Sequence, residues 1–257
     1  MTLTIATASL KGGAGKTTIS LNLAVAAEHA GVPTVVIDVD PQQAAAKWGD
    51  VRNETGRPPR VISAMASRLP QALHAAGQFG ANLIIIDTAA HAEGILLSSI
   101  DTVDLVLIPC RPTILDLQHL SATIRRSDLR AKDHIVILNA VRTGTIDRDQ
   151  AERALTDMGV NFARAGVSNL VAYARALTDG QGVTEFEPEG NAAHEMQQLL
   201  AEIRSMYPFS LAAFDREVNQ NSSNSPFDWL LPNRLVGGRK PNETVTQGPH
   251  PNPSASP

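Results

Sequence analysis

The sequence predicts an α/β fold, a doubly wound and mainly parallel sheet flanked by helices. Up to about residue 207, short apolar runs rich in β-branched residues alternate with longer segments of helical periodicity. Most runs are continuously apolar, as in the Leu-Ile-Ile-Ile stretch at residues 83–86, which is expected where helices cover both faces of a sheet. The chain has 257 residues, 43% of them hydrophobic, and this is enough for one sizeable core.

The individual elements follow from these runs in chain order. Strands are expected at residues 3–8, 34–38, 83–87, 105–109 and 135–139, and a weaker run at residues 60–62 would add an edge strand. Helices are expected at residues 16–30, 42–54, 69–76, 115–131, 148–158, 170–178 and 192–206. Gly31 follows the first helix at the position of a C-cap, just before the second strand.

The composition changes at residue 208. Half of the chain's 16 prolines lie in residues 208–257, together with many Asn and Ser residues. Such a segment buries too little apolar surface to offset the entropy of ordering it. We therefore predict one folded domain over residues 1–207 and a flexible tail over residues 208–257, in which the apolar stretch at residues 226–231 could dock on the domain or on a partner.

Charge and cysteine content narrow the class of protein. The net charge is −4, so any contact with nucleic acid must use a local basic patch. Cys110 is the single cysteine, which excludes an intrachain disulfide, and it is expected to be a buried small hydrophobe. The amino terminus lacks the pattern of a signal peptide, and no apolar run approaches membrane-spanning length. A cytoplasmic protein is the expectation.

A glycine-rich loop joins the first predicted strand to the first predicted helix. Its glycines allow backbone N–H groups to converge on a phosphate, and the helix N-terminus adds partial positive charge. In a phosphate loop of this kind Lys16 reaches the β- and γ-phosphate oxygens, Thr17 ligates Mg²⁺, and Thr18 contacts the α-phosphate. ATP and Mg²⁺ are the predicted cofactors, and a simple tight turn is the alternative. The loop reads Lys11-Gly12-Gly13-Ala14-Gly15-Lys16-Thr17-Thr18.

Carboxylates end two of the predicted strands. Asp38 and Asp40 close the second strand, and Asp87 closes the apolar run at residues 83–86. Ligands of open α/β sheets bind at the carboxyl ends of the strands, so Asp87 is predicted to hold Mg²⁺ there. For Asp38 and Asp40 the structural alternatives are an Asx turn and a helix N-cap.

These segments resemble the deviant-Walker ATPases of the ParA/MinD family. Leu10 stands where the ordinary phosphate-loop pattern has its first glycine, and the extra lysine, Lys11, follows it. The resemblance implies that two protomers clamp ATP between them and that Lys11 crosses to the partner's phosphates. It also implies that Asp40 orients the attacking water and that Asp38 supports the metal shell. One departure is Thr88-Ala89-Ala90, where the family usually has Thr and prolines or other small residues.

Two later segments extend the resemblance. Residues 107–116 are similar to the family's Pro-x-x-Pro loop, and Asp116 is expected either in the dimer interface or as a cap of its helix. Asn139 closes a later strand at a position where the family often has an adenine-reading asparagine, and its amide offers both a donor and an acceptor.

The resemblance is closest to small ParA-type partition ATPases. It implies a homodimer that binds DNA non-specifically with ATP, associates with the nucleoid and releases DNA when a ParB-like adaptor stimulates hydrolysis. The alternative is a MinD-like or cargo-positioning switch without DNA, although the tail lacks the basic amphipathic helix that membrane binding would need. A metabolic ATP-dependent ligase is a third reading. A nitrogenase-reductase-like carrier is disfavoured, because its shared cluster needs two cysteines per protomer. Candidate DNA contacts are Arg142, Arg148, Arg153, Arg164 and Arg175.

Overall fold

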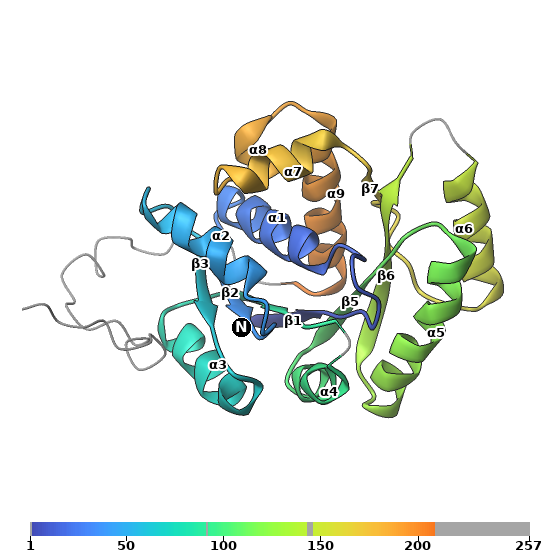
Figure 1. Ribbon diagram of the computed structural model, residues 1–257, viewed down its shortest axis with the longest axis horizontal. Coiled ribbons are helices and arrows are strands. Elements are labelled where there is room, and N and C mark those ends of the chain that lie inside the picture. Colours follow the sequence, from blue (N-terminus) through green and yellow to red (C-terminus); the bar gives the residue numbers. More distant parts are fainter. Residues whose placement is uncertain (1, 91, 143–145, 209–257) are drawn as a thin grey trace, which may run out of the picture.

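A parallel sheet of seven strands runs through the middle of the molecule in this computed structural model (Figure 1). The structure describes residues 2–90, 92–142 and 146–208. The spatial order is β3-β2-β4-β1-β5-β6-β7, and the paired neighbours run parallel. The strands are β1 (Leu3–Thr7), β2 (Thr34–Asp38), β3 (Arg60–Ser63), β4 (Leu83–Asp87), β5 (Leu105–Cys110), β6 (Asp133–Val141) and β7 (Val167–Ser168).

Helices cover both faces of the sheet (Figure 1). One face carries α1 (Lys16–His29), α2 (Ala44–Asn53), α7 (Val171–Thr178), α8 (Val183–Phe186) and α9 (Asn191–Met206). The other face carries α3 (Leu69–Gln78), α4 (Glu93–Asp101), α5 (Ile114–Leu129) and α6 (Asp147–Asp157), with a 3₁₀ turn, η1 (Ala66–Arg68), before α3. The predicted doubly wound α/β fold is confirmed.

Each strand contributes side chains to two separate cores. In β4, Leu83 and Ile85 pack under α1 and α9, while Ile84 and Ile86 pack on the side of α3 and α4. This alternation is the two-residue repeat of a strand, and because both faces are covered, both sets are apolar. The continuous apolar runs in the sequence therefore correspond to the strands buried at the centre of the sheet.

Most predicted elements agree with the structure within two residues. The weak run at residues 60–62 forms the edge strand β3. The C-cap of α1 is Ala30, and Gly31 follows it with a φ of 78°, the left-handed conformation that commonly ends a helix. Four elements were not predicted, namely the helices α4 and α8, the strand β7 and the 3₁₀ turn η1. None of the helices in the described ranges is long and apolar enough to cross a membrane. The predicted tail falls outside the described residues from residue 209 onward.

The register of the central strands brings the polar strand ends together. Asp87 of β4 pairs with Thr7 of β1 on one side and with Asp38 of β2 on the other. The loop that follows β1 therefore lies beside both carboxylates. This is the carboxyl edge of the sheet, where parallel α/β folds bind their ligands.

Candidate functional site

The loop between β1 and α1 presents backbone donors rather than side-chain caps. Gly13 and Gly15 have φ values of 72° and 98°, in the left-handed region that glycine adopts without strain. The helix α1 begins at Lys16, and no side chain of the described residues caps its first turn. Its first N–H groups and the positive end of the helix dipole thus face the loop, which is the arrangement that binds a phosphate.

Lys16 is the buried cation of this loop. Only 7% of the residue is exposed. Burial lowers the pKa of its ammonium group, while the charges of Asp87 and Asp40 act in the opposite direction. Water hydrates the ammonium group of a buried lysine only in part, so an anionic ligand at the loop would stabilise the charged form of Lys16.

Asp87 is fully buried and surrounded by hydroxyl groups. Thr17 Oγ1 donates to Asp87 Oδ2 at 2.7 Å, and Ser20 Oγ lies 3.2 Å from Asp87 Oδ1. Thr7 Oγ1 lies 3.3 Å from the same oxygen. Burial raises the pKa of Asp87 to about 7, and the neighbouring Asp38 adds to this, although the hydrogen bonds from Thr17 and Ser20 and the charge of Lys16 lower it. The Thr17 hydroxyl and the Asp87 carboxylate together form an oxygen donor pair of the kind that Mg²⁺ prefers.

Asp38 and Asp40 already serve the backbone. Asp38 Oδ1 accepts the N–H of Asp40 and its Oδ2 accepts the N–H of Ala46, both at 2.9 Å, so Asp38 ties the start of α2 to β2. Burial raises the pKa of Asp38 in spite of these bonds. Asp40 Oδ1 accepts the N–H of Gln42 at 2.9 Å, which is an Asx turn. The Asx turn is therefore present at both carboxylates, whereas the N-cap of α2 is Gln43 and neither Asp38 nor Asp40 occupies that position. Their roles in water and metal binding remain predictions, which would use the remaining lone pairs.

Lys11 contacts the start of α5 in the same chain. Its Nζ lies 2.7 Å from Asp116 Oδ2, and its side chain remains 36% exposed. Asp116 also interacts with Thr113, whose side chain caps α5. Burial acts to raise the pKa of Asp116, but the hydrogen bonds from Lys11 and Thr113 outweigh it and hold this pKa below its usual range. Asp116 thus holds Lys11 and supports the helix start at the same time.

Asn139 reaches the loop from the end of β6. Its Nδ2 donates to the carbonyl oxygen of Ala14 at 2.6 Å. Its predicted role in reading adenine is untested, but the structure shows a contact with the loop that sequence reasoning did not predict.

Three residues beside the loop were missed from the sequence. Ser20 and Thr7 hold Asp87, and the hydroxyl at residue 20 follows Thr17 by almost one helical turn, a spacing that could have indicated it. Arg111 follows β5, and its Nη2 lies 3.7 Å from the point that a Cβ on Gly13 would occupy. The guanidinium group of Arg111 therefore lies next to the loop. Cys110 beside it is buried, as predicted, and burial raises its pKa to about 12.

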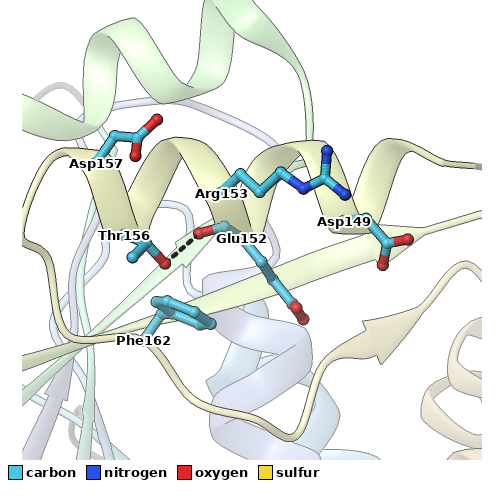
Figure 2. A pocket seen from close by; sticks show the side chains of 6 residues that line it. All are labelled: Asp149, Glu152, Arg153, Thr156, Asp157 and Phe162. Carbon is cyan, nitrogen blue, oxygen red and sulfur yellow. Dashed lines mark hydrogen bonds between the residues drawn. The ribbon is translucent and has the colours of Figure 1, made fainter.

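The candidate DNA-contacting arginines do not all lie on one surface, and two of them lie beside acidic groups. Arg148 Nε lies 2.7 Å from Glu152 Oε1 within α6. Arg153 lines an open hollow of about 360 Å³, and Figure 2 shows its guanidinium extending along α6 toward Asp149. Asp157, Thr156 and Phe162 complete this hollow, so acidic groups outnumber the arginine there. Arg175 lies on α7, which Figure 1 shows well apart from α6.

The site geometry agrees with a comparison to known protein families. Residues 5–183 match the model described as the CobQ/CobB/MinD/ParA nucleotide binding domain. The chain belongs to this family. The matched region runs from β1 to the start of α8 and includes the loop, Asp38, Asp87 and Asn139. The family is described as a nucleotide binding domain, and the loop between β1 and α1 lies within the matched residues.

Individual relatives within the family support the same assignment. A maintenance of carboxysome distribution protein A from Gloeobacter kilaueensis is 29% identical over 190 residues, covering 73% of this chain and 85% of that protein. Protein ParA from Rhizobium radiobacter is 26% identical over 226 residues, covering 82% and 96%. The structure of the septum site-determining protein MinD from Pyrococcus horikoshii, in complex with Mg-ADP, has a TM-score of 0.64 and 20% identity, covering 80% of this chain and 97% of that one. That last likeness confirms the fold.

Proposed function

We propose that this family ATPase positions a cellular cargo by cycling between a monomer and an ATP-bound dimer. The observation that carries the proposal is the place of Lys11. Its ammonium group stands at the loop, yet it is held by Asp116 and partly exposed. A second protomer that brings a nucleotide close to this lysine offers it a more strongly charged partner than one carboxylate.

The chain's own groups divide the work of hydrolysis in this proposal. The N–H groups of the loop and Lys16 bind the phosphates, and the Thr17–Asp87 pair holds Mg²⁺, which supplies charge neutralisation when bound. Burial of Asp87 keeps its carboxylate fixed in position. Asp40, beside Lys16 at the end of β2, orients the attacking water. These roles need no covalent step on the protein, because phosphoryl transfer depends on positioning and charge stabilisation.

The dimer would form by exchange of one ion pair for another. In the free chain Lys11 is bound to Asp116, so a phosphate of the partner's nucleotide must replace that carboxylate. The exchange links dimer formation to ATP, because the phosphates supply the competing charge. Hydrolysis and loss of phosphate would return Lys11 to Asp116 and separate the protomers.

Non-specific DNA is the proposed track for this cycle, with a ParB-like adaptor that stimulates hydrolysis. Support comes from the relative named ParA and from the exposed arginines Arg142, Arg164 and Arg175. The test is fluorescence anisotropy of an arbitrary labelled duplex with ATP, ADP or no nucleotide, over a range of salt concentrations. We expect binding with ATP alone and a linear fall of log affinity with log salt. Absence of binding at low salt would exclude DNA as the track.

A second candidate is a positioning switch that uses a protein scaffold or a membrane and no DNA. The acidic hollow on α6 favours it, since Asp149, Glu152 and Asp157 surround one of the arginines that DNA binding would use. The relative named for maintenance of carboxysome distribution supports cargo positioning under both candidates. Cosedimentation with anionic vesicles, or capture on isolated cargo without DNA, would support this candidate over the first.

A further inference from the structure

We propose that Asn139 positions the phosphate loop and that it does so for any polyphosphate ligand, whichever base the ligand carries. Asn139 is 7% exposed, and its Nδ2 donates a hydrogen bond of 2.6 Å to the carbonyl oxygen of Ala14. Buried polar groups are hydrogen-bonded, and such a bond fixes the group that accepts it. This role rests on the proposed binding of nucleotide by the loop.

The fold turns the Asn139 side chain toward the loop. The last residue of β5, Cys110, pairs with Leu138, so Asn139 is the next residue along β6 after this pairing. On its other side Asn139 pairs with Val167 of β7, and the register then shifts before Val141. Asn139 can therefore reach past the end of β5 to the loop that follows β1, which is next but one in the sheet.

The hydrogen bond sets the direction of one backbone donor of the loop. In a planar trans peptide the carbonyl and the N–H group point in opposite directions. With the Ala14 carbonyl held toward Asn139, the N–H of Gly15 points away from Asn139, where it can donate to a phosphate. Without this bond the peptide is free to rotate, because Gly15 tolerates many backbone conformations. A rotated peptide would present a carbonyl oxygen to the phosphate in place of a donor.

Gly15 is matched to Asn139 in space. A Cβ at this position would overlap the Asn139 amide nitrogen, and the φ of Gly15 is 98°. Gly15 therefore allows the positive φ of the loop, and its missing side chain leaves room for the Asn139 amide group. Ala14, Gly15 and Asn139 act as one unit, although 125 positions separate Ala14 from Asn139 in the chain.

The predicted adenine contact and the proposed positioning role give different results. An adenine contact affects only ligands that carry the base. A positioning role affects every ligand that uses the Gly15 N–H, including inorganic tripolyphosphate, which has no base.

The experiment measures the affinity of Mg²⁺-ATP and of Mg²⁺-tripolyphosphate by calorimetry for the parent chain, Asn139→Ala and Asn139→Asp. Asn161→Ala is the control, because Asn161 is exposed and lies before the bridge to Val136. We expect both Asn139 variants to lose about tenfold or more in affinity for both ligands by a similar factor, and the control to match the parent. Loss of affinity for ATP alone overturns the proposal and leaves nucleotide binding intact. A parent that binds neither ligand overturns nucleotide binding by the loop as well.

A second readout separates positioning from a general loss of structure. In the nucleotide-free chain, the amide NMR resonance of Gly15 should move in Asn139→Ala, and the side-chain amide protons of Asn139 should exchange slowly in the parent. Thermal unfolding checks that the variants remain folded. An unchanged Gly15 resonance in a folded Asn139→Ala variant overturns the proposal.

Discussion

Replacing Asp87 with Asn should stabilise the nucleotide-free chain at alkaline pH while removing Mg²⁺-dependent hydrolysis. Asp87 is fully buried, and burial raises its pKa from the ordinary value of 3.8 to about 7. The folded chain therefore holds this proton more tightly than the unfolded chain does. Stability from this group is fully present below about pH 4 and is lost as the pH rises to about 7, because over this range the unfolded chain has released the proton while the folded chain still holds it.

The rise in the pKa of Asp87 from 3.8 to about 7 corresponds to a loss of about 4 kcal/mol in the free energy of unfolding once the pH exceeds 7. Asn is neutral at every pH, and its amide oxygen can accept from Thr17 as the carboxylate does. Urea unfolding with EDTA, followed by circular dichroism, should show equal stabilities for parent and Asp87→Asn near pH 4 and a more stable variant at pH 8.5. Asp157→Asn, at an exposed position of α6, is the control. If the difference in unfolding free energy between the parent and Asp87→Asn does not grow from pH 4 to pH 8.5, the raised pKa of Asp87 is refuted.

Three further predictions concern ion pairs and cations. Asp116→Asn should release the Lys11 ammonium group, so an amine-reactive ester should label Lys11 about two- to fivefold faster, as measured by mass spectrometry. An unchanged labelling rate would contradict the ion pair between Lys11 and Asp116. Arg111→Ala should weaken ATP binding about tenfold in calorimetry. Arg111→Lys should restore little of this affinity, because lysine lacks the planar guanidinium group. Full affinity in Arg111→Ala would show that this guanidinium does not contact the nucleotide. Arg52→Met should cost about 3–5 kcal/mol in urea unfolding, because the buried Glu185 loses its partner at 2.8 Å and keeps the longer contact with Arg57 Nη1 at 3.6 Å. The double variant with Glu185→Leu should recover part of this loss.

The fold and the residue types of the site could be predicted because local sequence determines them. The run at residues 83–86 is buried on both faces, and its composition alone shows this. The helix α4 was missed because it contains Gly94 and no side chain within the described residues caps its start, so packing of Leu96 and Ile100 against the sheet defines it. The strand β7 has two residues and no periodicity, and it forms because its backbone pairs with β6.

The contacts within the site could not be predicted because they join distant segments. The sequence shows that Lys11 is present but not that Asp116, 105 positions away, holds it. Likewise, Asn139 was assigned to the base from its place in a motif, whereas its hydrogen bond to Ala14 depends on how the sheet places the end of β6 near the loop that follows β1. Asp38 was assigned to the metal, and its bond to the N–H of Ala46 appears only when α2 is placed over β2.

The most direct test of the central claim is the mass of the chain in solution with and without nucleotide. Light scattering after size exclusion should show a monomer without nucleotide and a dimer with the slowly hydrolysed analogue ATPγS. Lys11→Ala should bind ATPγS but remain a monomer. Lys132→Ala is the matched control, because Lys132 precedes β6 at the opposite edge of the sheet from the loop, and it should dimerise like the parent. A Lys11→Ala variant that dimerises as fully as the parent would contradict the claim that this lysine joins the two protomers.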